Sequence, residues 1–171
     1  AVIAIENVRL FNELQTSNRD VTIALERETA SSQILGVISR SQTDIQPVMD
    51  TIADSARRLC GGVQSWVVRY DGKLSYLVAH SNVSPEVADY WREEFKVFTP
   101  RPGLITTRAI FSGAVAHVPD VEADSDYEHV TPRRAGYRSA LGVPLLKDGR
   151  AIGAVAVSRR EAGPFAETEI Q

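Results

Sequence analysis

The stretch that decides the fold is residues 139–158, Ser139-Ala-Leu-Gly-Val-Pro-Leu-Leu-Lys-Asp-Gly-Arg-Ala-Ile-Gly-Ala-Val-Ala-Val-Ser158. Two apolar runs, residues 139–146 and 151–158, flank Lys147-Asp-Gly-Arg150. Asp-Gly is the pair that a two-residue type I′ turn prefers, because both central residues of that turn have a positive φ. The stretch therefore predicts an antiparallel β-hairpin.

A second hairpin is predicted upstream, where residues 65–70 and 73–80 flank Asp71-Gly72. A type I′ turn at this pair would give the hairpin two faces with different residues. The first face would carry Val67, Arg69, Leu74, Tyr76, Val78 and His80. The second would carry Trp66, Val68, Tyr70, Ser75, Leu77 and Ala79. The first face mixes apolar bodies with polar tips, which is the composition expected of a pocket wall.

Several segments around these hairpins carry apolar side chains at the spacing of a helix. Residues 45–60 repeat apolar side chains at i, i+3, i+4 and i+7, which predicts a helix with one buried face that ends at Gly61-Gly62. Residues 86–96 predict a helix with a bulky ridge of Val87, Trp91 and Phe95. Residues 104–111 predict a short helix, residues 114–118 a strand, and residues 119–134 a long acidic surface loop. Antiparallel strands with helices segregated around them indicate an α+β domain.

The net charge, the cysteine count and the length of the apolar runs exclude several classes of function. With 19 basic and 22 acidic residues the net charge is -3, which gives no electrostatic footprint for nucleic acid or an anionic membrane surface. Cys60 is the single cysteine, which excludes an internal disulfide and suits a reducing cytoplasm. No apolar run approaches the roughly 18 to 20 residues that span a bilayer. A cytoplasmic location without membrane contact is expected.

Residues 1–40 contain Gly36 as their one helix breaker and predict a long helix. A heptad places Asn7, Leu14, Val21, Glu28 and Leu35 at a, and Ile3, Leu10, Ser17, Ala24, Ser31 and Ile38 at d. This seam is apolar at its ends and polar in the middle. It would pair two chains loosely into a homodimer. The alternative is a helix that packs one apolar stripe on its own domain.

Several segments resemble GAF domains of bacterial sensor histidine kinases and related cyclases. They are residues 45–60 followed by Tyr70-Asp-Gly, then Ser139-Ala-Leu-Gly-Val-Pro-Leu, Ala151-Ile-Gly-Ala-Val-Ala-Val and Pro164-Phe165. The resemblance implies a GAF-like central antiparallel sheet flanked by helices over residues 41–171, preceded by a signalling helix. It also implies that residues 41–171 stop before the last helix of the family.

Residues 1–16 look like the last helix of a GAF domain. They are interpreted as the tail of a preceding GAF domain in a tandem array with an output domain, or as a linker helix with a similar sequence. In either case, we expect this helix, from the same or a partner chain, to cover the apolar surface beside residues 45–60.

The resemblance also implies a pocket that the Trp91 and Phe95 ridge and the helix of residues 104–111 close. The candidate ligand-binding residues are Arg69, Tyr76, His80, Trp91, Phe95, Ile105, Arg108, His117, Tyr127, Tyr137 and Arg138. A collapsed core without a ligand, in which the aromatic side chains only pack, is the alternative.

No catalytic or metal-binding residue is predicted. The sequence lacks a Gly-x-Ser-x-Gly elbow, a phosphate-binding Gly-x-x-x-x-Gly-Lys-Ser/Thr loop and a His-Glu-x-x-His pair. The acidic residues between 120 and 128 lack the glycine and glutamate positions of an EF-hand. Some GAF relatives are thiol-dependent sulfoxide reductases, but that chemistry needs more than one well-placed cysteine.

The ligand is not identified by the sequence. Bilin-binding relatives carry a thioether-forming cysteine near the pocket, and this chain has none after Cys60, so covalent bilin is not expected. Haem would need His80 or His117 as an axial ligand, and a lone histidine on an apolar strand is more often structural. No phosphate-binding signature points to a cyclic nucleotide. Two functions remain: a non-catalytic sensory module that relays a signal through dimeric N-terminal helices, and a ligand-free dimerisation spacer.

Overall fold

A computed structural model describes residues 15–32 and 45–170 of the chain. Its centre is a five-stranded antiparallel sheet in the order β2-β1-β5-β4-β3. The strands are β1 (Gln64–Tyr70), β2 (Ser75–Ser81), β3 (Ala116–Val118), β4 (Ser139–Lys147) and β5 (Arg150–Arg159). The helices are α2 (Gln46–Leu59), α3 (Pro85–Glu94), α4 (Ile105–Ser112), α5 (Val130–Ala135) and α6 (Glu167–Ile170). The predicted α+β class, with a central antiparallel sheet flanked by helices, is confirmed.

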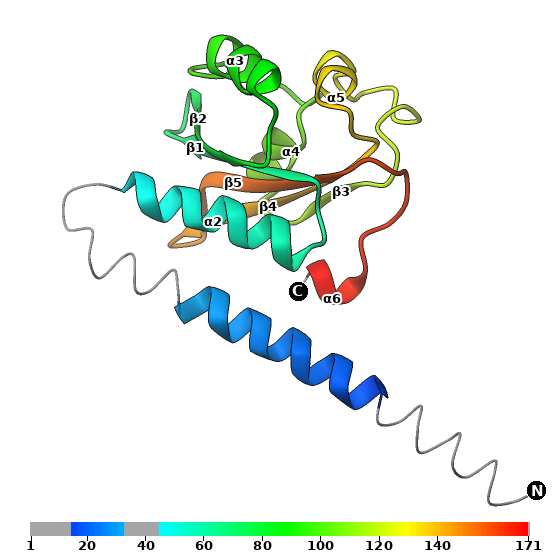
Figure 1. Cartoon of the computed structure of the whole chain (residues 1–171). Coiled ribbons are helices and arrows are strands. Elements are labelled where there is room, and N and C mark those ends of the chain that lie inside the picture. The colour runs from blue at the N-terminus through cyan, green and yellow to red at the C-terminus, as the bar shows by residue number, and fades with distance from the viewer. Residues whose placement is uncertain (1–14, 33–44, 171) are drawn as a thin grey trace, which may run out of the picture.

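Helices cover both faces of this sheet (Figure 1). On one face, α2 packs Ala53 against Val67, Ala79 and Val155. On the other, α3 and α4 pack against a larger apolar cluster that includes Trp66, Val68 and Ala154. The side chains of β1 alternate between these two faces. Because helices cover both faces, the side chains on both sides of β1 are buried.

The hairpin of β4 and β5 forms as predicted. Lys147 pairs with Arg150, and the two residues between them, Asp148 and Gly149, have φ angles of 51° and 75°. Positive φ at both positions is the requirement of a type I′ turn. Gly142 on β4 lets α4 approach the sheet, since a Cβ there would lie 2.8 Å from the carbonyl oxygen of Ile105.

The prediction of a type I′ turn at Asp71-Gly72 is wrong. Tyr70 pairs with Ser75, so the connection has four residues, and Gly72 has a positive φ of 98° while Asp71 does not. The Asp71 carboxylate accepts hydrogen bonds from the backbone N–H groups of Lys73 and Leu74 at 2.9 and 2.8 Å. These bonds stabilise the wider turn, because an aspartate side chain substitutes for a backbone acceptor.

The predicted loop over residues 119–134 is also partly wrong, because α5 begins at Val130. The Glu128 carboxylate accepts from the backbone N–H groups of Val130 and Thr131 at 2.7 and 3.1 Å. It thereby satisfies donors that a helix start leaves free. Six residues are too few to give a hydrophobic period that a sequence reading would detect.

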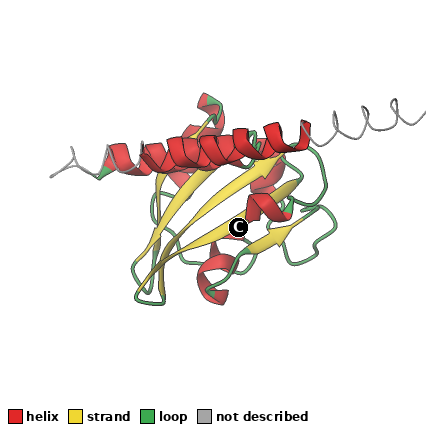
Figure 2. Cartoon of the chain, turned by 90° about the horizontal axis from the view of Figure 1, so that it is seen from below, coloured by secondary structure: helices red, strands yellow, loops and turns green. Residues whose placement is uncertain are grey.

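The N-terminal helix is described over residues 15–32, on the same side of the sheet as α2 (Figure 2). Ala30 is buried, and Arg27 donates a hydrogen bond to the carbonyl oxygen of Thr168 at the start of α6. The expectations about residues 1–14, 33–44 and 171 lie outside the described residues. Among residues 15–32 and 45–170, no helix is both long and apolar enough to cross a membrane.

Candidate functional site

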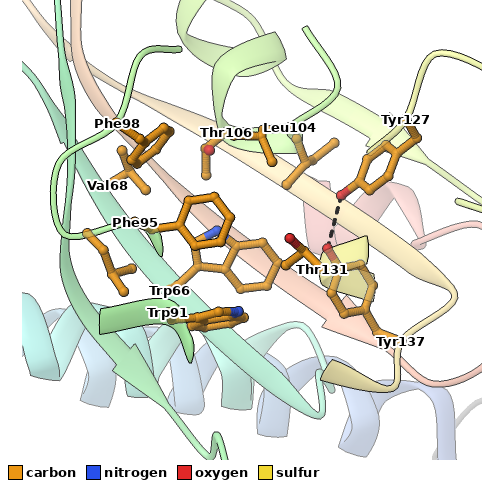
Figure 3. Close-up of a pocket in the computed structure, with 12 residues that line it drawn as sticks. Trp66, Val68, Trp91, Phe95, Phe98, Leu104, Thr106, Tyr127, Thr131 and Tyr137 are labelled. Carbon is orange, nitrogen blue, oxygen red and sulfur yellow. Dashed lines mark hydrogen bonds between the residues drawn. The ribbon is translucent and has the colours of Figure 1, made fainter. Parts of the chain in front are cut away.

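A small cavity lies between the sheet and the helices α3, α4 and α5 (Figure 3). Its volume is about 30 Å³. A single water molecule needs roughly 10 to 15 Å³ on this measure. The lining residues are Trp66, Val68, Leu77, Trp91, Phe95, Phe98, Leu104, Ile105, Thr106, Tyr127, Thr131 and Tyr137. The cavity is thus small, and aromatic residues make up half of its lining.

The aromatic rings pack edge to face. The ring centroids of Trp66 and Trp91 lie 5.1 Å apart with an interplanar angle of 63°, and those of Phe95 and Phe98 lie 5.2 Å apart at 86°. Trp66 comes from β1, while the i, i+4 spacing on α3 places Trp91 and Phe95 on the same side of that helix. Edge-to-face pairs add stability beyond the burial of their surface.

Two tyrosine hydroxyls meet at one end of the cavity. The hydroxyl oxygens of Tyr127 and Tyr137 lie 3.3 Å apart, and both side chains are buried (Figure 3). Burial raises the pKa of Tyr127 to about 12 and raises the pKa of Tyr137 well above its ordinary value. Both hydroxyls therefore stay protonated at neutral pH and act as neutral hydrogen-bonding groups.

Trp91 carries a fully buried polar group in this wall that the protein leaves unsatisfied. Its side chain is 2% exposed, and within residues 15–32 and 45–170 its indole Nε1–H has no hydrogen-bond acceptor. Indole nitrogen only donates. A buried donor without an acceptor costs about 1 to 3 kcal/mol. Such groups are uncommon in folded proteins and call for an explanation, which a function can supply.

A salt-bridged loop closes the site on the side of Tyr127. Arg108 on α4 contacts Asp124 through both of its terminal nitrogens, at 2.5 and 3.2 Å. This hydrogen bonding lowers the pKa of Asp124. The Arg108 guanidinium also lies over the Tyr127 ring, 5.3 Å from its centroid. The pair therefore fixes the loop that carries Tyr127 against the helix that carries Ile105.

Five of the predicted ligand-binding residues line this cavity: Trp91, Phe95, Ile105, Tyr127 and Tyr137. The other six do not.

The cavity does not lie on the face of the first hairpin that the sequence predicts as a pocket wall. The cavity lies on the face of Trp66, Val68 and Leu77. The face of Val67 packs under α2, because the apolar stripe of that helix needs a partner. Arg69 and Tyr76 are consequently outside the cavity and contact each other, with the guanidinium carbon 4.1 Å from the ring centroid.

His80 is a different case, because a β-bulge changes its face. The register shifts between Val67 and Val68, and His80 pairs with Trp66. Its imidazole lies edge-on to Trp91, with the ring centroids 6.2 Å apart, but it is exposed and does not line the cavity.

His117, Arg108 and Arg138 also lie outside. The Nε2 atom of His117 accepts from the backbone N–H of Phe165 at 3.2 Å, and partial burial lowers the pKa of this histidine. Arg108 lies behind Tyr127, as described above. Arg138 is half exposed and forms a two-bond pair with Asp120. These three side chains have structural partners.

Seven lining residues were missed as site residues: Trp66, Val68, Leu77, Phe98, Leu104, Thr106 and Thr131. The strand alternation does group Trp66, Val68 and Leu77 on one face of the first hairpin, but the pocket is predicted on the opposite face. Thr106 and Thr131 carry no comparable signal, because isolated threonines occur throughout the chain.

The cavity walls offer little for acid–base or metal chemistry. The lining includes no aspartate, glutamate, histidine, lysine, arginine or cysteine. Across residues 15–32 and 45–170, no group of three or more histidine, cysteine or carboxylate side chains is placed to hold a metal ion. The arrangement suits the binding of a small, mostly apolar molecule.

Solved structures with the same fold come from several bacterial proteins. The GAF domain of a phosphoenolpyruvate-protein phosphotransferase from Coxiella burnetii has a TM-score of 0.68 at 14% identity, over 86% of this chain and 83% of that chain. The free methionine-R-sulfoxide reductase of Neisseria meningitidis, solved with its substrate, has a TM-score of 0.65 at 22% identity, over 87% and 81%. A domain of a two-component sensor histidine kinase protein from Sinorhizobium meliloti has a TM-score of 0.58 at 17% identity, over 75% and 82%.

Among curated proteins, none matches the chain. A family profile described as "GAF domain" matches residues 42–171, which is most of the chain. With the sheet order, the flanking helices and the shared fold, this match shows that the chain belongs to the GAF domain family.

Proposed function

We propose that this chain is a non-catalytic sensory module of a cytoplasmic signalling protein, which binds a small molecule in the cavity under α3. GAF domains are typical of sensory and regulatory signalling proteins. The observation that carries the proposal is the unsatisfied indole donor of Trp91 in the cavity wall. A ligand with an acceptor at this position would remove the penalty of a buried, unpaired donor.

The small cavity volume means that a ligand needs an opening, and α3 is the element best suited to provide it. Unlike the backbones of α2 and α4, the backbone of α3 does not lie close to any strand, so α3 contacts the sheet mainly through its side chains. Large side chains, Trp91 and Phe95, fill the space between α3 and the sheet (Figure 3). A ligand would take the place of these rings while α3 moves outward.

The relay would run through the helix of residues 15–32, paired with the same helix of a second chain. This helix approaches α2 with Glu26, Thr29 and Ala30. The heptad positions Val21 and Glu28 point elsewhere and are exposed. The helix therefore has one face on its own domain and a separate face for a partner. A polar seam would hold two packings of similar free energy, as a switch requires.

Catalysis is not part of the proposal. One fold relative is a methionine sulfoxide reductase, and a thiol mechanism would need cysteines at the site. The single cysteine, Cys60, packs with Leu141 and Phe165 on the α2 face of the sheet. The sheet separates it from the cavity, whose lining residues come from the opposite face.

The competing function is a ligand-free spacer, and the volume of about 30 Å³ favours it. Tryptophan fluorescence separates the two, because both tryptophans of the chain, Trp66 and Trp91, line the cavity. We expect compounds from a library of small metabolites to change this emission saturably. They should not do so in Thr106→Leu, where the larger side chain fills the cavity.

The same samples give a second readout. Hydrogen exchange should be faster in α3 than in α2 and α4, and a ligand should slow it. No fluorescence response across the library, with exchange in α3 as slow as in α4, would favour the spacer.

A further inference from the structure

The walls of the cavity carry no charge. Two arginines contact lining rings without belonging to the lining: Arg101 lies 5.9 Å from the Phe95 centroid, and Arg108 lies 5.3 Å from that of Tyr127. Arg108 is also neutralised by Asp124. A charged ligand would lose its hydration here without gaining a counter-ion, which is costly. The site therefore selects uncharged molecules.

The hydrogen-bonding groups of the cavity select an acceptor. The hydroxyls of Tyr127 and Tyr137 face each other at 3.3 Å, and Thr131 Oγ1 lies 3.5 Å from the hydroxyl of Tyr90. Among residues 15–32 and 45–170, Trp91 Nε1–H is the fully buried donor of the cavity lining for which the protein provides no acceptor. A ligand that only donates would leave this N–H unpaired, whereas a carbonyl oxygen would satisfy it.

The shape of the walls selects a flat ring. Trp66, Trp91, Phe95 and Phe98 surround the space, and their rings already pair edge to face with one another. An aromatic ligand can replace one of these partners and keep the same kind of contact. An extended aliphatic chain could not make this edge-to-face contact.

We propose that the ligand is an uncharged aromatic compound with a carbonyl-type acceptor, and that Trp91 Nε1–H donates to that acceptor and determines specificity. This inference rests on the proposed function, since it requires the cavity to open for a ligand. The covering helix α3 is held at its C-terminal end, where the backbone N–H of Leu77 donates to the carbonyl of Phe95 at 3.0 Å. The donor at Trp91 precedes this anchor by about one turn of helix and moves with α3.

Three probes of matched shape test the proposal. Acetophenone has the ring and the carbonyl, ethylbenzene lacks the acceptor, and benzoate carries a charge. Binding is followed by the two indole N–H resonances of the ¹⁵N-labelled chain, assigned with the single variants Trp66→Phe and Trp91→Phe. We expect acetophenone to bind about three- to tenfold more tightly than ethylbenzene, the range that one neutral hydrogen bond provides. It should also move the Trp91 resonance downfield.

Benzoate should leave both resonances unchanged. In Trp91→Phe the ring remains but the donor is lost, so acetophenone and ethylbenzene should bind equally. Trp66→Phe, the matched control, should keep the preference for acetophenone.

Two kinds of failure are distinguishable. Equal binding of acetophenone and ethylbenzene to the unmodified chain, tight binding of benzoate, or a preference that persists in Trp91→Phe would overturn the ligand class while leaving a ligand pocket in place. If none of the three probes moves either resonance at millimolar concentration, the cavity does not open to such molecules. That result would overturn both this inference and the proposed sensory function.

Discussion

Replacing Arg108 with glutamine should loosen the loop that carries Tyr127. Arg108 makes two bonds to Asp124, at 2.5 and 3.2 Å, and its Nε–H donates to the carbonyl of Pro102 at 2.7 Å. The side chains of Arg108 and Asp124 are 25% and 26% exposed, so water screens the pair only in part. Hydrogen bonds to charged groups contribute about 1.5 to 3 kcal/mol. We expect Arg108→Gln to lower the free energy of unfolding by about 2 kcal/mol, within this range.

The same loop provides a matched control. Arg133 also makes two bonds to its partner Glu122, through Nε and one terminal nitrogen, at 3.0 and 2.9 Å, but its side chain is 65% exposed. Exposed pairs contribute about 0 to 1 kcal/mol. Urea unfolding of Arg108→Gln and Arg133→Gln, followed by tryptophan fluorescence, compares the two. A cost for Arg133→Gln equal to that for Arg108→Gln would refute the reasoning, because burial would then not set the strength of the pair.

The Arg108–Asp124 pair should also make the free energy of unfolding depend on pH in the acidic range. Hydrogen bonding from Arg108 lowers the pKa of Asp124 below its ordinary value of 3.8 in the folded chain. A carboxylate with a lowered folded pKa contributes stability that is complete above its unfolded pKa and is lost as the pH falls through the folded pKa. Stability from this pair should therefore be constant above about pH 5 and decline below about pH 4. The decline should be shallower in Arg108→Gln.

Three further predictions concern other parts of the chain. Gly142→Ala should cost about 1 to 3 kcal/mol in urea unfolding, because its Cβ would meet the Ile105 carbonyl oxygen at 2.8 Å; an unchanged midpoint would contradict this. Burial raises the pKa of Cys60, so iodoacetamide should react more slowly with the folded chain at pH 8 than with the urea-unfolded chain, and equal rates would show that the thiol is accessible. Replacing both Glu28 and Ser31 with leucine should strengthen self-association in sedimentation, because it makes the polar centre of the seam apolar; an unchanged mass distribution would argue against pairing through this face.

An Asp-Gly pair in the sequence predicts that a turn occurs there, but it does not determine the type of turn. Asp148-Gly149 and Asp71-Gly72 are the same pair, yet the first forms the two-residue turn and the second a four-residue loop. The difference lies in the Asp71 side chain, which accepts from two backbone N–H groups and from the hydroxyl of Tyr76. Which local hydrogen bonds prevail depends on the strand register, and the dipeptide does not specify it.

The pocket face could not be chosen from the alternation of β1 alone. Trp66 and Val68 on one face, and Val67 on the other, are all buried, because helices cover both sides of the sheet. The polar tips of Arg69 and Tyr76 favour the opposite face, where they form a cation–π pair outside the cavity. The ridge of Trp91 and Phe95 was a better guide, since a helix of period 3.6 with one aromatic side must cover an apolar surface.

Determining the structure of the chain purified from its own host tests the central claim most directly. The measurement is electron density in the space between β1 and α3, beneath Trp91 and Phe95. We expect density for a small molecule with an acceptor within hydrogen-bond distance of Trp91 Nε1, and α3 displaced from the sheet. A space filled by the same side chains, without ligand density and with α3 in place, would contradict the proposed sensory function and favour a spacer.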